Sequence, residues 1–232
     1  MKKWSRRLVC AAVPALPGLA ADVSHEMSSR RATGDAREWR DSGSAFWGGA
    51  ADAVMERDSH ARPVPHHRTE VRSRWTTDHL YFLFSCSYEE LHLKPAPKLD
   101  AETNELWNWD VAEVFLGADF HNIRLYREFE VSPQGEWVDL DVDLNKPHHE
   151  DGWVWSSGFE VAARIDADHK VWYGTMRIPY TSIDARPAAV GNTLRMNLYR
   201  SQGPGHQGIA WQSTGKETFH APEVFGTLRL VD

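Results

Sequence analysis

The chain has 232 residues, of which 41% are hydrophobic and 25% are charged, so it can bury a core and is not disordered as a whole. Its formal net charge is -7 and no basic stripe occurs, which excludes the electrostatic pattern of a nucleic-acid-binding protein. Apart from a leader, this length suits one all-β domain.

The first 21 residues have the three regions of a signal peptide. Basic residues run from Lys2 to Arg7, an apolar run extends from Leu8 to Leu19, and small residues follow as far as Ala21. The apolar run contains two prolines and is much shorter than the ~20 residues that a membrane-spanning helix needs. We therefore expect an exported protein, secreted or periplasmic, without a membrane span.

Residues 22–67 are rich in Ser, Arg, Gly, His and Pro, and we expect them to form a partly irregular lead-in that packs on a domain at 68–232. Within that domain, short apolar and aromatic runs alternate with turn residues, which favours an all-β fold. We predict a two-sheet antiparallel β-sandwich, jelly-roll-like and with little helix beyond one turn at 180–183. The predicted strands are 70–75, 80–87, 111–117, 126–132, 137–142, 159–165, 171–178, 194–200 and 227–231.

Alternation assigns faces in these strands. In the strand at 111–117 it places Ala112, Val114 and Leu116 in the core, so that Glu113 and Phe115 lie on the opposite face. In the strand at 137–142 it separates aliphatic from acidic residues, which predicts one core face and one solvated face. The same alternation at 194–200 places the aliphatic residues in the core.

Two segments resemble the carbohydrate-binding modules of family 9 and the family 9-like domains related to them. The first is Trp107 followed by the strand DVAEVF at 110–115, similar to a family pattern in which a tryptophan precedes Val-Glu-Ile-Phe. The second is FHAPEVFGTLRL at 219–230, similar to the approach to the family's last strand. The resemblance covers about residues 69–232.

The resemblance implies non-catalytic binding of an oligo- or polysaccharide by stacking and directed hydrogen bonds. Trp107 matches one aromatic plate of the family's sugar clamp and Glu113 its hydroxyl-binding carboxylate. Phe219 stands where the family has a second tryptophan, and Glu130 stands where it has an arginine. The predicted ligand-binding residues are Trp107, Trp109, Glu113, Phe219, His220 and Glu130.

The resemblance also implies partner glycoside hydrolases and a structural Ca²⁺, for which Asp139, Asp141 and Asp143 could supply oxygen ligands from one strand face. No catalytic residue is predicted. Glu128 and Glu130 share a strand face and are the only pair considered for glycoside hydrolysis.

Two other kinds of function stay open. Related sandwich domains hold haem between a methionine and a histidine, although alternation places Met176 and Met196 in the core. A protein-interaction scaffold with a degenerate sugar site is the other alternative. Cys86 lies in an apolar stretch, where a buried and unreactive thiol is expected.

Overall fold

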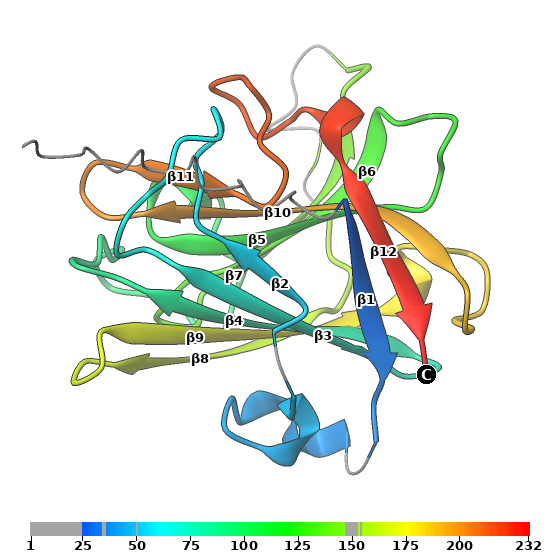
Figure 1. Ribbon diagram of the computed structural model, residues 1–232, viewed down its shortest axis with the longest axis horizontal. Coiled ribbons are helices and arrows are strands. Elements are labelled where there is room, and N and C mark those ends of the chain that lie inside the picture. The colour runs from blue at the N-terminus through cyan, green and yellow to red at the C-terminus, as the bar shows by residue number, and fades with distance from the viewer. Residues whose placement is uncertain (1–24, 34–35, 50, 147–152, 154) are drawn as a thin grey trace, which may run out of the picture.

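The computed structural model describes residues 25–33, 36–49, 51–146, 153 and 155–232 (Figure 1). The predicted signal peptide lies outside these residues. Among them, no helix is long and apolar enough to cross a bilayer. The strands are β1 (Glu26–Arg31), β2 (Ala53–Met55), β3 (Thr69–Trp75), β4 (His79–Ser87), β5 (Val111–Gly117), β6 (Leu125–Val131), β7 (Trp137–Asp143), β8 (Glu160–Asp166), β9 (Val171–Pro179), β10 (Thr193–Gln202), β11 (Gln207–Ala210) and β12 (Gly226–Val231). The 3-10 helices are η1 (Ala36–Arg40), η2 (Ala45–Trp47), η3 (Leu106–Asn108), η4 (Tyr180–Ser182) and η5 (Pro222–Val224).

The described strands form one continuous hydrogen-bonded path in the order β7-β6-β5-β10-β12-β1-β3-β4-β9-β8, with β11 added to β10 and β2 to β3. The path folds over, so that β7, β6, β5 and β10 form one wing and β3, β4, β9 and β8 form the other. β12 and β1 connect the two wings along one side of the molecule (Figure 1). The result is an all-β sandwich that approaches a barrel.

The prediction of two separate antiparallel sheets is therefore only partly correct. β1 pairs in parallel with β12 on one side and with β3 on the other, and it makes the sheet mixed and continuous. β1 lies in the segment for which we expected partly irregular structure. The sequence pattern did not predict this strand, because Ser29 is fully buried at a position where an apolar residue is usual. The hydroxyl of Ser29 is satisfied by a 2.8 Å hydrogen bond that the hydroxyl of Ser73 donates.

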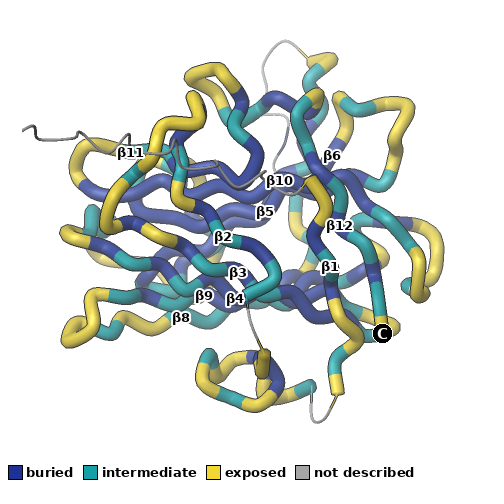
Figure 2. Tube along the Cα trace, viewed as in Figure 1, coloured by how far each residue is buried: buried dark blue, intermediate teal, exposed yellow. Residues whose placement is uncertain are grey.

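The main core lies between the two wings and draws apolar side chains from both. Phe82 and Phe84 of β4 pack in the same cluster as Val114 of β5, Phe129 of β6 and Met196 of β10. Buried residues concentrate along the central strands, whereas the loops at both ends are exposed (Figure 2). The predicted core faces of 111–117 and 194–200 are confirmed.

Both outer faces of the sandwich are also covered. On the outer face of β4, a cluster that includes Trp39 and Trp47 from η1 and η2 packs on Tyr81 and Leu83. On the outer face of β5, β6, β7 and β10, a second aromatic cluster forms beneath loops. Its members include Leu106, Val111, Phe115, Tyr126, Val138, Leu140, Val142, Trp153 and Tyr199.

The prediction of one core face and one solvated face for the strand at 137–142 is only partly correct. Val138 and Leu140 are buried, but in this second cluster on the outer face; on the other face Asp139 is 1% exposed, whereas the side chain of Asp141 is 46% exposed. All nine predicted strands are present to within two residues, as are the turn between β8 and β9 and the helical turn at η4.

Candidate functional site

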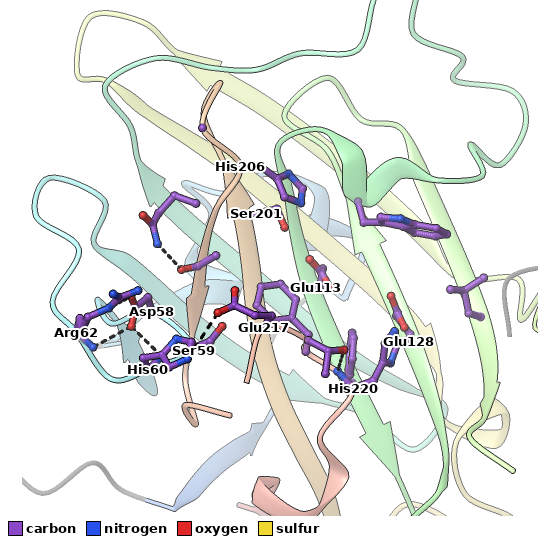
Figure 3. Close-up of a pocket in the computed structure, with 18 of the residues that line it drawn as sticks. Asp58, Ser59, His60, Arg62, Glu113, Glu128, Ser201, His206, Glu217 and His220 are labelled. Atoms are coloured by element: carbon purple, nitrogen blue, oxygen red, sulfur yellow. Dashed lines mark hydrogen bonds and ion pairs between the residues drawn. The ribbon is translucent and has the colours of Figure 1, made fainter. Parts of the chain in front are cut away.

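A pocket of about 520 Å³ lies on the outer face of the β10-β5-β6-β7 wing. Its floor comes from neighbouring strands, with Glu113 and Phe115 from β5, Glu128 from β6 and Leu140 from β7. Its walls come from η3, the turn and first residues of β11 at 205–208, and the loops at 58–62 and 217–220. In Figure 3, Glu113 and Glu128 extend toward the pocket from adjacent strands, with the 58–62 loop on the other side.

Phe219 forms an aromatic part of the wall and is held by its surroundings. Its ring stacks on Tyr199 with the centroids 4.3 Å apart and the planes inclined by 10°. On β11, a Cβ added to Gly208 would come within 2.9 Å of the Phe219 ring. The ring therefore rests directly against the backbone of Gly208, which fixes its position at the pocket.

His220 continues this wall and is fixed in the same way. Its ring stacks on Phe115 with centroids 5.4 Å apart, and its Nδ1 atom lies 2.6 Å from the hydroxyl of Tyr126. Burial is the main reason that the pKa of Tyr126 is raised, so the phenol stays protonated. The tautomer of His220 decides whether the phenol donates to Nδ1 or accepts from it.

Three glutamates form the most unusual part of the floor. Glu113 of β5 is opposite Glu130 of β6, and Glu128 shares the face of Glu130 two residues away. Their exposed fractions are 2%, 0% and 3% for Glu113, Glu130 and Glu128 respectively. One carboxylate oxygen of each lies within 4.8 Å of one oxygen of each of the others. We call these three residues the glutamate cluster.

Burial shifts the protonation of the cluster. It raises the pKa of Glu128 to about 7, and it raises the pKa of Glu113 and of Glu130 well above the usual range. The neighbouring carboxylates raise the pKa of Glu113 and Glu130 further, because like charges disfavour ionisation. Without a bound cation, the cluster is therefore largely protonated near neutral pH.

The loop at 58–62 forms the opposing wall and has its own internal hydrogen bonds. One carboxylate oxygen of Asp58 accepts from the backbone N–H groups of His60 and Arg62, both at 2.9 Å. The other accepts from Nε of Arg62 at 2.7 Å. Burial alone would raise the pKa of Asp58, but these hydrogen bonds outweigh it and hold the pKa below its usual range. Asp58 is thus ionised and already neutralised.

The structure brings four of the six predicted binding residues to one pocket, namely Trp107, Glu113, Phe219 and His220. Glu130 does not line the pocket, but it is the cross-strand neighbour of Glu113 and belongs to the glutamate cluster. Trp109 does not line the pocket, because its ring packs edge-on against His92, with the centroids 4.6 Å apart.

Sequence reasoning missed the loop at 58–62, the β10–β11 turn and Trp153 as parts of the site. β11 is only four residues long and contains a glycine, so alternation gave no signal for it. Glu128 was considered only as a partner of Glu130. The cross-strand register that brings Glu113 to both of them depends on which strands are neighbours.

The acidic residues considered for calcium are held by three different partners. Asp139 accepts hydrogen bonds from Ser157, Asp141 forms an ion pair with Arg127, and Asp143 accepts from its near neighbour Asn145. The described residues do not gather them into a ligand set, so calcium at that strand face remains an untested prediction. Met176 and Met196, the residues considered for haem, are fully buried in the core rather than at the pocket.

A β-sandwich with an aromatic, carboxyl-lined pocket on one outer face defines a class of small ligand-binding modules. Within this class, the chain belongs to the family described as carbohydrate family 9 binding domain-like, whose sequence profile matches residues 42–232. No curated protein matches the chain in sequence.

Several solved structures share the fold. A protein from Bacteroides uniformis, provisionally assigned as carbohydrate-binding, has a TM-score of 0.66 at 15% identity, with 88% of this chain and 98% of that chain covered. A family 9 carbohydrate-binding module from Caldicellulosiruptor kristjanssonii in complex with cellotriose has a TM-score of 0.60 at 11% identity, with 89% and 93% covered. A module from the same organism in complex with glucose has a TM-score of 0.57 at 11% identity, with 88% and 95% covered.

Proposed function

We propose that the chain is a non-catalytic module that binds an oligo- or polysaccharide in the pocket lined by Trp107, Glu113 and Phe219. The observation that carries this proposal is that an indole, a carboxyl group and a phenyl ring from distant parts of the sequence line one concave site. The family supports a carbohydrate as the ligand, and so do the two structures of a Caldicellulosiruptor family 9 module in complex with cellotriose and with glucose.

Two kinds of contact would hold the sugar. The indole of Trp107, and the face of the Phe219 ring that Tyr199 does not cover, offer apolar area on which the C–H face of a pyranose can stack. Carboxyl and imidazole groups on the floor and wall supply the few polar contacts that orient a ligand in such a site. A protonated carboxyl group both donates and accepts a hydrogen bond, which suits a sugar hydroxyl.

The arrangement of the carboxyl groups favours binding over hydrolysis. A glycoside hydrolase usually needs two carboxyl groups that flank the scissile bond. Glu113 and Glu128 lie side by side on the floor, on adjacent strands, instead of facing each other across the pocket. Two acidic residues lie on the opposing walls. Asp58 is occupied by Arg62 and by backbone N–H groups, and the side chain of Glu217 is 97% exposed and lies 3.8 Å from His60. Neither carboxyl group is therefore both buried and unpaired.

The proposal extends to export and to support of polysaccharide breakdown by partner glycoside hydrolases. The signal-peptide pattern in the first 21 residues favours export. Membership of a carbohydrate-binding family is consistent with a partner enzyme that acts on the same polysaccharide.

Calorimetric titration with xylo-, cello- and manno-oligosaccharides tests the sugar site. We expect one of these series to bind, and Trp107→Ala to weaken that binding at least tenfold, or about 1.4 kcal/mol. Trp109→Ala is the matched control, because Trp109 packs on His92 outside the pocket and should leave the affinity unchanged. If no carbohydrate binds, or if Trp107→Ala binds as tightly as the native chain, the proposed function is wrong.

A further inference from the structure

The glutamate cluster has no positive partner among the described residues. Among the ion pairs formed by the described part of the chain, none involves Glu113, Glu128 or Glu130. The one guanidinium that lines the pocket, that of Arg62, is paired with Asp58. Three acidic side chains, each at least 97% buried, are therefore collected at one point without compensation. Such an arrangement is unfavourable unless the groups stay protonated or a cation joins them.

Among the described residues, several buried oxygen atoms of the cluster have no hydrogen-bond donor outside it. Both carboxylate oxygens of Glu130, and one oxygen each of Glu113 and Glu128, accept no hydrogen bond from an N–H or hydroxyl group of these residues, and the side-chain interaction of Glu130 is with Glu128 inside the cluster. Most buried polar atoms in proteins have a partner, and an exception often marks an ion. Glu130 is the strongest case, because it is completely buried and neither of its oxygens has a hydrogen-bond donor outside the cluster in the described part of the chain.

We propose that the glutamate cluster is a binding site for a divalent metal ion of the calcium class. Two oxygens that bind the same ion at the usual distance of 2.3–2.6 Å lie at most about 5 Å from each other. The observed limit of 4.8 Å between the three oxygens fits inside such a coordination shell. Three carboxylates can supply up to about six oxygens when each binds through both atoms, near the number that calcium requires.

The chemistry of the cluster separates calcium from other cations. Mg²⁺ keeps several waters and is commonly held by one or two carboxylates, whereas this cluster is buried and has three. Zn²⁺ prefers nitrogen and sulfur ligands, and the cluster contains only oxygen. The ammonium group of an amino sugar would have to reach the oxygens of Glu130, which are buried and do not line the pocket.

The proposed ion would lie at the base of the pocket. Glu113 and Glu128 line the pocket and share the cluster with Glu130, so an ion held by all three would border the ligand space. Water would complete the coordination shell when no sugar is bound. In a part of the inference that rests on the proposed function, sugar hydroxyls would replace this water and bind the metal directly.

Equilibrium dialysis of the full chain against Ca²⁺, without sugar and after removal of divalent cations, tests the metal site. We expect one Ca²⁺ per chain and at least a tenfold weaker affinity in Glu130→Gln. Glu136→Gln is the matched control: Glu136 is also fully buried, but it lies 3.6 Å from Lys94 and outside the cluster, so this variant should bind Ca²⁺ as the native chain does.

Thermal unfolding separates a metal ligand from a structural residue. Ca²⁺ should raise the melting temperature of the native chain and of Glu136→Gln, and should leave that of Glu130→Gln unchanged. A native chain without stoichiometric Ca²⁺, or a Glu130→Gln variant that binds it normally, would overturn the proposal. So would cluster-dependent binding of glucosamine oligomers in place of Ca²⁺.

These outcomes are independent of the sugar titration. Calcium binding without any carbohydrate affinity would remove the proposed function and leave the metal site. Carbohydrate binding by a native chain that takes up no Ca²⁺ in the dialysis would remove the metal site and leave the proposed function.

Discussion

The joint between β1 and β3 provides a sharp test of what holds the two wings together. These strands are in register over only two residue pairs, Arg30 with Arg74 and Arg31 with Trp75. Asp52 reinforces this short contact. One of its oxygens pairs with Arg30 of β1, and the other accepts from Arg74 at 3.0 Å and from the Ser73 backbone at 2.9 Å. We predict that Asp52→Ala strongly destabilises the fold.

The magnitude follows from burial. The side chains of Asp52 and Arg74 are 2% and 6% exposed, so removing the carboxylate leaves a guanidinium buried without its counter-ion. Breaking a buried pair in this way costs about 3–5 kcal/mol. That is a large part of the roughly 5–15 kcal/mol by which a typical domain is stable. Asp52→Asn should cost less, because the amide oxygen can still accept from Ser73.

Urea denaturation measures these changes as shifts in the midpoint at constant slope. The double variant Asp52→Ala/Arg74→Met should be more stable than the sum of the two single effects predicts, because it leaves no unpaired charge. A loss below about 1 kcal/mol in Asp52→Ala, or strict additivity in the double variant, would refute the reasoning.

Three further predictions concern single side chains. Gly208→Ala should displace the ring of Phe219, because the new Cβ would come within 2.9 Å of that ring, and should weaken carbohydrate binding several-fold with little loss of stability. Calorimetric titration with the oligosaccharide that binds the native chain measures the change, and an unchanged affinity contradicts the prediction. Trp39→Ala should lower the free energy of unfolding by about 3–5 kcal/mol, because Trp39 is 4% exposed and covers the outer face of β4. Urea denaturation measures this loss, and a loss below about 1 kcal/mol would show that the fold does not need this side chain. Cys86 should resist alkylation at pH 8 in the folded chain and react in urea, as peptide mapping would show, because burial raises the pKa of its thiol to about 11; rapid modification of the native chain would argue against this.

The strand pattern could be predicted from the sequence because alternation survives wherever the inner face of a strand is apolar. Ala112, Val114 and Leu116 show this clearly, and each lies in the core as expected. Alternation failed where burial does not follow hydrophobicity. In β1 the buried Ser29 is satisfied by a hydroxyl partner from β3, and no local signal reveals that partner.

The candidate site was predictable in part for a similar reason. Trp107, Glu113 and Phe219 could be selected by their resemblance to a family, and they share one pocket. The glutamate cluster could not be found this way. Its members become neighbours only through the pairing of β5 with β6, and strand pairing depends on the whole fold.

The parallel pairing of β1 with β12 has a consequence for how the chain folds. Residues 26–30 are in register with residues 227–231, so this contact closes a loop of about 200 residues. Contacts between such distant segments slow folding, because the entropy of closing the loop is lost before the contact forms. The first described strand has to wait for the last one before the sheet becomes continuous. Until then each wing exposes an unpaired edge, and such edges favour aggregation of the incompletely folded chain.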